Sequence, residues 1–353
     1  MIGVLNLKCR LSIILVFTSI FACQESDPEE YLIIGTQEEE FALVSKPFDE
    51  LDDARRLKSS IFQAFRGGTV DSVIYNEGGL LDIRYAVQDG VAIPADEDGL
   101  ILWSFAWYLA EVRRYMLERG VEMGSMFPVT IAYAPGIGTD LTDHTNAFFV
   151  CGRYQHLYGV LPDFYNDLVP LAANQGVVRH EFGHHLFHYL VADSAPSCLQ
   201  YEIDGNWLGF SAAHEGFADV VATLSLENPH FIGPSYPLDE RDVRLDTHVA
   251  DADTYTVSLS DADPYKLGSV IAAFAWDVRE ALGAENTLLA FIEAARRLRG
   301  VPENRDPEVV LVAPNELVLL VVEVLAEQHT DALETACTSL SVRFPTLESP
   351  QCS

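Results

Sequence analysis

The spacing of apolar residues before residue 100 changes from irregular to helical and then to alternating. Residues 24–47 are acidic and only weakly periodic, and they predict a tether that contains one short strand at 31–34. The spacing over 49–65 predicts a helix. Two alternating runs follow, and they predict strands at 70–75 and 80–87 with a glycine-containing turn between them.

From residue 100 onward, apolar residues recur mostly at helical spacing. A strongly apolar helix is expected at 100–119, and Gly120 ends it. Short apolar runs predict buried strands at 129–133 and 146–151. Further helices are expected at 176–192, 212–227, 266–282, 287–298 and 315–328.

This order of elements predicts an α+β fold class and four segments. We expect a signal peptide at 1–22, a tether and N-terminal segment at 23–65, an α+β lobe with a metal-binding helix at 66–195, and a mainly helical lobe at 196–353. The composition is typical of a globular chain, since 49% of the 353 residues are hydrophobic and 21% are charged.

The first residues have the pattern of an export signal. Lys8 and Arg10 precede an apolar stretch at 11–22 that is too short to cross a bilayer comfortably. The stretch ends before Cys23 in a sequence that resembles a bacterial lipoprotein cleavage box, with Cys23 as the acylated first mature residue. Phe21 is bulkier than such a box usually has, so simple cleavage without acylation is the alternative. We expect an exported protein, anchored in the cell envelope through Cys23 or otherwise secreted.

The chain is strongly acidic, with 53 Asp and Glu residues against 22 Lys and Arg residues and a net charge of −31. This charge argues against nucleic acid as a partner, because phosphate binding needs a basic surface. It also disfavours electrostatic docking on anionic lipid. We therefore expect contact with a membrane only through a lipid on Cys23.

Export changes what the cysteines imply. Beyond Cys23 the chain contains Cys151, Cys198, Cys337 and Cys352, and four cysteines in an oxidising compartment predict two disulfides. Three pairings are open. The local pair Cys337–Cys352 is favoured, which leaves Cys151 to pair with Cys198.

The strongest chemical motif is His180-Glu181-Phe182-Gly183-His184. Two histidines four residues apart share one face of a helix, where two imidazoles can bind one Zn²⁺. Glu181 can act as general base on the attacking water. Random order would give this motif in roughly 0.02 of chains of this composition. The alternative is a helix that carries two histidines by coincidence, and His185 and His188 add to that chance.

A second motif, His214-Glu215-Gly216-Phe217-Ala218-Asp219, also falls on a predicted helix. Catalytic zinc sites typically use three protein ligands, and Glu215 can supply the third. Asp219 follows one helical turn later, where it can accept a hydrogen bond from a ligand histidine and fix its tautomer. His214 is a competing third ligand, but it would leave the spacing between Glu215 and Asp219 unexplained.

Together the two motifs resemble the gluzincin zinc metallopeptidases, especially the thermolysin-like and fungalysin-like families. The resemblance implies a zincin fold with an N-terminal sheet-plus-helix lobe, a mainly helical C-terminal lobe and an active-site cleft between them. It also implies that Asn146 and Ala147 belong to an edge strand along which a substrate peptide adds as a further strand.

One catalytic position departs from the family pattern. Tyr265 stands before an apolar helix, where the family has a histidine that stabilises the transition state. A tyrosine hydroxyl can donate the same hydrogen bond to an oxyanion. Tyr265 as a simple packing aromatic is the alternative, and His248 and Tyr255 compete for the role.

These residues predict a zinc-dependent endopeptidase that acts on protein or peptide substrates. The ligands would be His180, His184 and Glu215, with Glu181 as general base. The alternative is a catalytically inactive surface lipoprotein that keeps the fold for protein binding; an aminopeptidase is disfavoured because no motif for a substrate amine is present. The aspartates of 239–263 could bind Ca²⁺, although a solvated acidic loop is the better interpretation without ordered ligand spacing.

Overall fold

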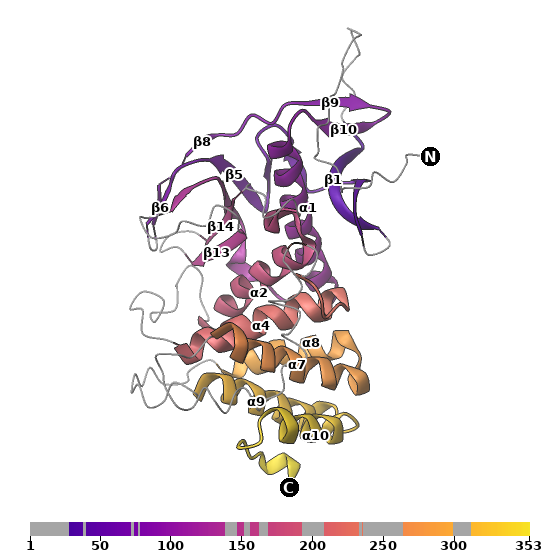
Figure 1. Ribbon diagram of the computed structural model, residues 1–353, viewed down its shortest axis with the longest axis vertical. Helices are drawn as coiled ribbons and strands as arrows, with labels where there is room; N and C mark the ends of the chain where they lie inside the picture. The colour runs from indigo at the N-terminus through magenta and orange to yellow at the C-terminus, as the bar shows by residue number, and fades with distance from the viewer. Residues whose placement is uncertain are drawn as a thin grey trace.

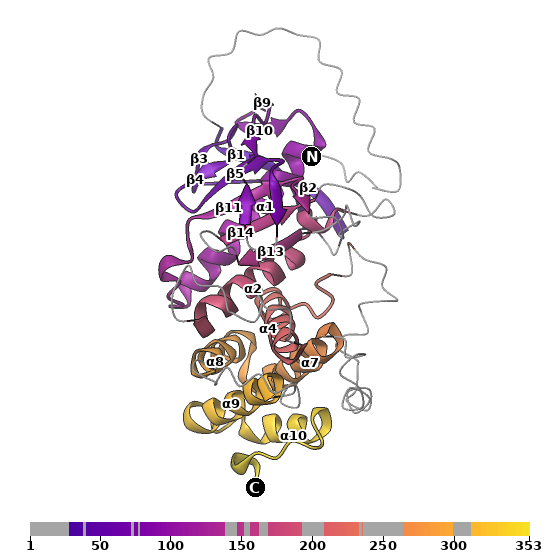
Figure 2. The ribbon, with the colours of Figure 1, turned by 90° about the vertical axis from the view of Figure 1, so that its left-hand side faces the viewer.

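The computed structural model describes residues 28–37, 40–71, 74–76, 78–137, 147–151, 156–161, 169–192, 208–232, 235, 264–298 and 312–353. Strands from the first 160 residues gather at one end of the molecule, and the later helices follow one another toward the other end (Figure 1). The second view shows the same order, with α9 and α10 farthest from the sheets (Figure 2). The expected α+β class is confirmed.

The strands are short, and most belong to the first half of the chain. They are β1 (Glu30–Gln37), β2 (Glu40–Lys46), β3 (Leu51–Asp53), β4 (Lys58–Ser59), β5 (Phe62–Arg66), β6 (Thr69–Asp71), β7 (Ile74–Asn76), β8 (Gly79–Leu80), β9 (Tyr85–Gln88), β10 (Val91–Pro94), β11 (Val129–Tyr133), β12 (Gly136–Ile137), β13 (Ala147–Cys151) and β14 (His156–Val160). Among the described residues, one sheet has the order β2-β1-β10-β9 and another β13-β14-β11-β5-β4-β3, with β8 beside β5. A small sheet has the order β12-β6-β7.

Two predictions for the N-terminal region are wrong. The strand expected at 31–34 lies within β1, but the remainder of the expected tether is also ordered, because β1 pairs antiparallel with β2 over most of the segment. The expected helix at 49–65 is instead a series of turns and strands, because short polar side chains bind nearby backbone groups and compete with a helix. Asp53 accepts hydrogen bonds from the N–H groups of Arg55 and Arg56. The hydroxyl of Ser59 accepts hydrogen bonds from the N–H groups of Ile61 and Phe62.

The sheet that contains β11 lies next to the helix with the first histidine motif. All of β11 is buried, and it pairs in parallel with β5 on one side and β14 on the other. β13 pairs antiparallel with β14 and ends the sheet. The predicted strand at 129–133 is confirmed, and that at 146–151 is confirmed from Ala147 onward. The described residues of the run at 70–75 lie in β6 and β7, and the run at 80–87 contributes to the short strands β8 and β9.

The helices agree with their predicted positions to within a few residues. They are α1 (Glu97–Glu118), α2 (Gln175–Ala192), α4 (Leu208–Leu226), α7 (Pro264–Leu282), α8 (Ala284–Arg297), α9 (Val312–Gln328) and α10 (Leu333–Arg343), of which only α10 was not expected. Side chains set two of the starts: Asp96 accepts from the N–H of Gly99 before α1, and Asn174 accepts from the N–H of Gly176 before α2. Gly120 follows α1 with a φ of 74°, as the prediction of its end requires.

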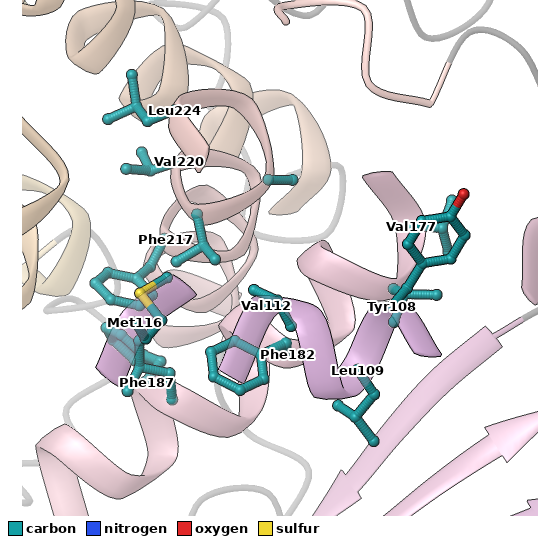
Figure 3. Close-up of a cluster of buried hydrophobic side chains, with 14 of the residues drawn as sticks. Tyr108, Leu109, Val112, Met116, Val177, Phe182, Phe187, Phe217, Val220 and Leu224 are labelled. Atoms are coloured by element: carbon teal, nitrogen blue, oxygen red, sulfur yellow. The ribbon is translucent and has the colours of Figure 1, made fainter. Parts of the chain in front are cut away.

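One apolar core holds α1, α2 and α4 together. Figure 3 shows its side chains meeting between the three helices: Tyr108, Leu109, Val112 and Met116 from α1, Val177, Phe182 and Phe187 from α2, and Phe217, Val220 and Leu224 from α4. These side chains are buried. Burial of each large apolar side chain contributes about 1.5–3 kcal/mol, so the packing fixes the two motif-bearing helices against α1.

Of the expected disulfides, Cys337–Cys352 is present and closes the C-terminal tail onto α10. The pairing of Cys151 with Cys198 falls outside the described residues, as do the signal peptide, Cys23 and the aspartates at 239–263. No helix within the described ranges is both long and apolar enough to cross a membrane.

A buried arginine ties the same three helices together by polar contacts. Arg179 of α2 forms an ion pair with Glu111 of α1, and its Nη1 donates to the carbonyl of Ser225 in α4 at 3.3 Å. The side chain of Arg179 is only 4% exposed. A buried charge that loses its partner is strongly destabilising, so this ion pair is a requirement for the packing around the first motif.

We expect Glu111→Ala to lower the free energy of unfolding by about 2–3 kcal/mol, because Arg179 is left buried without its carboxylate. Urea denaturation measures this loss. The matched control is Glu50→Ala, which breaks the pair with Arg114, a side chain that is 44% exposed. The control should cost less than about 1 kcal/mol, and equal losses in the two variants would contradict the account.

Candidate metal centre

The first motif presents two imidazoles from one face of α2. His180 and His184 lie one turn apart on the helix, and their ring centroids are 4.5 Å from each other. Both residues are buried. The predicted helix thus brings the two nitrogen donors to one place, on the side of α2 that faces α4.

Glu215 reaches the same place from α4. Its Oε2 lies 3.3 Å from Nε2 of His180 and 3.6 Å from Nε2 of His184. Donor atoms bonded at about 2.0–2.2 Å to a tetrahedral ion lie about 3.3–3.6 Å apart, so these separations fit a shared metal ion. Within the described residues, His180, His184 and Glu215 form the group whose ligand atoms converge closely enough to hold a metal.

Asp219 lies one turn after Glu215 on α4 and contacts the first histidine. Its Oδ1 is 2.8 Å from Nδ1 of His180, on the ring edge opposite to the nitrogen that faces Glu215. In the neutral imidazole, a proton held on Nδ1 by this contact leaves Nε2 as the metal-binding nitrogen. Phe231 stacks against the same imidazole at a centroid distance of 6.0 Å. Hydrogen bonding and packing together fix the orientation of His180.

The electrostatic balance at His180 favours positive charge. Burial alone would lower the pKa of His180, but the carboxylates of Asp219 and Glu215 outweigh it and raise the pKa to about 10. A bound metal ion must displace the proton that this imidazole otherwise holds. The two carboxylates therefore make the site attractive for a cation, whether a proton or a metal ion.

Glu181 points toward the edge strand β13. Its Oε2 accepts a hydrogen bond of 2.8 Å from the N–H of Phe149, and the side chain is buried beside the two histidines of its helix. This backbone contact was not predicted, since a main-chain donor leaves no mark in the residue type. Ala147 lies two residues earlier on the same strand and is buried; Asn146 falls outside the described residues.

Tyr265 occupies the second position of α7 and is 41% exposed. It lies three residues before Gly268, and a Cβ placed on Gly268 would be 3.0 Å from the Cβ of Glu215. Tyr265 therefore lies one helical turn before the residue of α7 that packs against Glu215. The competing residues His248 and Tyr255 fall outside the described residues.

His214, the competing third ligand, has a different place. Its Nε2 lies 3.3 Å from the carbonyl oxygen of His184, and its ring packs at 4.0 Å from the ring of His184. Burial holds the pKa of His214 well below its usual range. The imidazole is therefore neutral, and it packs against His184. The oxygen that lies near Nε2 of His180 and Nε2 of His184 belongs to Glu215.

The other histidines of α2 belong to the core. His185 is fully buried, and its Nδ1 shares a hydrogen bond of 2.9 Å with the hydroxyl of Tyr158. Its ring stacks on that of Phe149 at a centroid distance of 4.8 Å. Burial lowers its pKa well below the usual value, so it remains neutral. His188 is also buried and packs 4.6 Å from His214. The histidine-rich helix thus contains the two histidines that could hold a metal on one face and packing imidazoles on others.

No family model matches the chain, and no curated protein matches its sequence. Among solved structures, the fold is similar to that of the precursor of protealysin, a metalloproteinase from Serratia proteamaculans, with a TM-score of 0.52. The likeness covers 80% of this chain and 86% of that chain at 10% sequence identity. At this identity the likeness shows a metalloproteinase-like fold. Separately, His180, His184 and Glu215 of this chain form a group that could hold a metal.

Proposed function

We propose that the chain is a zinc-dependent endopeptidase of the gluzincin type. The observation that carries the proposal is the convergence of His180, His184 and Glu215, with Glu181 next to the ligand histidines. Two imidazoles and one carboxylate form a common ligand set of catalytic zinc, with a position left for water or substrate. The fold shared with a metalloproteinase precursor supports the same reaction class.

A zinc ion held by these three residues would polarise the scissile carbonyl and lower the pKa of a water molecule toward about 7. Glu181 would take the proton of the attacking water at its carboxylate and later deliver it to the leaving amine. The hydrogen bond from Phe149 holds Glu181 between the edge strand and α2, where such a water and the substrate would meet. Tyr265 would donate its hydroxyl hydrogen bond to the developing oxyanion.

The substrate would bind as an extended peptide along β13. This strand ends its sheet, so one of its edges has no neighbouring strand among the described residues. An edge strand offers main-chain groups to an added strand. Because the N–H of Phe149 at this edge bonds to Glu181, a peptide here lies next to the general base. Asn146 and Ala147 would provide further contacts to it.

For its cellular setting, we propose an exported protein that is anchored by a lipid on Cys23 or secreted after cleavage before it. The basic residues and short apolar stretch of the first 22 residues support export. The net charge of −31 supports protein or peptide, rather than nucleic acid, as the partner.

The direct test of the function is Glu181→Gln. We expect the full chain to bind one zinc ion and to cleave internal bonds of casein, and we expect the variant to bind zinc equally but to cleave about 10²–10⁴-fold more slowly, since general acid–base catalysis contributes about this factor. Fragment analysis by mass spectrometry and metal analysis measure the two properties. Glu118→Gln, an exposed glutamate of α1, is the matched control and should retain full activity.

Zinc binding without cleavage of casein or of a broad peptide library by the parent chain would contradict the enzyme. That outcome would favour the alternative of an inactive surface lipoprotein that keeps the fold for protein binding. Equal cleavage by the parent and Glu181→Gln would instead contradict the assigned general base.

Removal of the carboxylate next to His180 tests the metal centre itself. We expect Asp219→Ala to weaken zinc affinity about 10–100-fold, as is usual for the partners that orient metal ligands. Competition with a chromophoric chelator measures this loss. The control is Asp277→Ala on α7, which removes a carboxylate bound to Arg343 and Ser339. This control should destabilise the fold while leaving zinc affinity unchanged; equal zinc losses would contradict the role of Asp219.

The oxyanion role of Tyr265 predicts a specific kinetic effect. Because the hydrogen bond would form in the transition state, Tyr265→Phe should lower kcat about 10²–10³-fold with little change in KM or in zinc content. Steady-state kinetics on an internally quenched peptide measure both constants. An unchanged kcat would show that Tyr265 is a packing residue.

A further inference from the structure

Helix α4 carries Glu215 and Asp219, and it is held between α2 and α7 by contacts that leave no room for a side chain. A Cβ placed on Gly183 of α2 would lie 2.6 Å from the Cα of Ala218. On the other side, a Cβ placed on Gly268 of α7 would lie 2.8 Å from the backbone nitrogen of Gly216. Non-bonded carbon atoms normally lie about 3.5–4.0 Å apart, so at both points helix backbone approaches helix backbone.

Both contacts adjoin residues of the metal centre. Gly183 immediately precedes the ligand His184, and Ala218 immediately precedes Asp219. Gly268 faces the third ligand itself, since its Cβ would lie 3.0 Å from the Cβ and 3.2 Å from the carbonyl carbon of Glu215. The contact at Gly183 therefore fixes α4 relative to α2, and the contact at Gly268 packs α7 directly against the backbone and Cβ of Glu215.

The ligand set tolerates little movement of α4. Oε2 of Glu215 already lies 3.3 Å and 3.6 Å from the two histidine nitrogens, which matches a tetrahedral ion with bonds of about 2.0–2.2 Å. Functional sites require their groups to be held within about 0.5 Å of the productive geometry. Relief of the 2.8 Å contact at Gly268 to an ordinary van der Waals distance would move the backbone by about 0.7 Å or more, which exceeds this tolerance.

We propose that Gly183 and Gly268 are positioning residues that set the distance between Glu215 and the two ligand histidines, and so set metal affinity. This inference rests on the metal site of the proposed function and adds the means by which two separate helices present one ligand set. It differs from a purely structural role, in which the glycines allow close helix packing but the position of Glu215 does not depend on them.

The test is Gly268→Ala in the full chain, with zinc affinity measured by competition with a chromophoric chelator. Because the added methyl pushes on Glu215 and Gly216, we expect zinc to bind at least about 10-fold more weakly than in the parent. The rise in melting temperature on adding zinc should shrink accordingly, since that rise depends on the ratio of zinc concentration to Kd. Cobalt-loaded protein should show an altered visible absorption spectrum, which reports ligand geometry.

Two control variants separate positioning from stability. Ile271→Val removes a methyl group from the same α4–α7 contact, where Ile271 packs against Gly216. It should lower the melting temperature of the metal-free protein but leave zinc affinity unchanged, because no atom is added beside Glu215. Gly79→Ala adds a methyl where no atom lies within 4 Å, and it should change neither property.

The outcomes distinguish this inference from the proposed function. A parent chain that binds no zinc overturns the metal site and the inference together. A parent that binds zinc, with Gly268→Ala binding it as tightly and giving the same cobalt spectrum, overturns the inference alone. If Gly268→Ala does not fold, Gly183→Ala tests the same claim from the opposite face of α4, and unchanged zinc affinity in that variant overturns it.

Discussion

The candidate site depends on the crossing of α2 and α4, because neither helix alone carries all three residues that could hold a metal ion. α2 supplies His180 and His184, and α4 supplies the carboxylate of Glu215 at 3.3–3.6 Å from their nitrogens. The rest of the described structure holds this crossing in place. The apolar core with α1 packs both helices (Figure 3), and α7 packs against α4 on its other side. Arg179 of α2 joins all three helices through its ion pair with Glu111 of α1 and its hydrogen bond to the carbonyl of Ser225 in α4.

The charges of the site explain why such a buried arrangement suits a cation. Two carboxylates, of Glu215 and Asp219, lie at opposite edges of the His180 imidazole and raise its pKa to about 10 despite burial. Buried carboxylates are costly without positive charge nearby. A divalent ion would supply that charge to Glu215 directly and to Asp219 through the imidazole of His180. The neighbouring His185 and His214 are held neutral by burial, so they add no competing positive charge.

The parts of the site that the sequence could predict are those encoded by side-chain type and helical spacing. Four-residue spacing placed His180 with His184 and Glu215 with Asp219, and helical periodicity located α1, α2, α4 and α7. The sequence could not predict contacts made by backbone, such as the N–H of Phe149 on Glu181 or the close approach at Gly268. The region 49–65 was mistaken for a helix because its periodicity resembles one, while Asp53 and Ser59 bind local N–H groups and form turns between strands.

The central claim, that these two helices together hold one catalytic metal ion, can be tested most directly by crystallography of the zinc-loaded protein. Diffraction data collected just above and below the zinc absorption edge locate the ion without reference to activity. We expect one strong anomalous peak within about 2.0–2.2 Å of Nε2 of His180, Nε2 of His184 and a carboxylate oxygen of Glu215. No peak at this position, or an ion held by His214 in place of Glu215, would contradict the central claim.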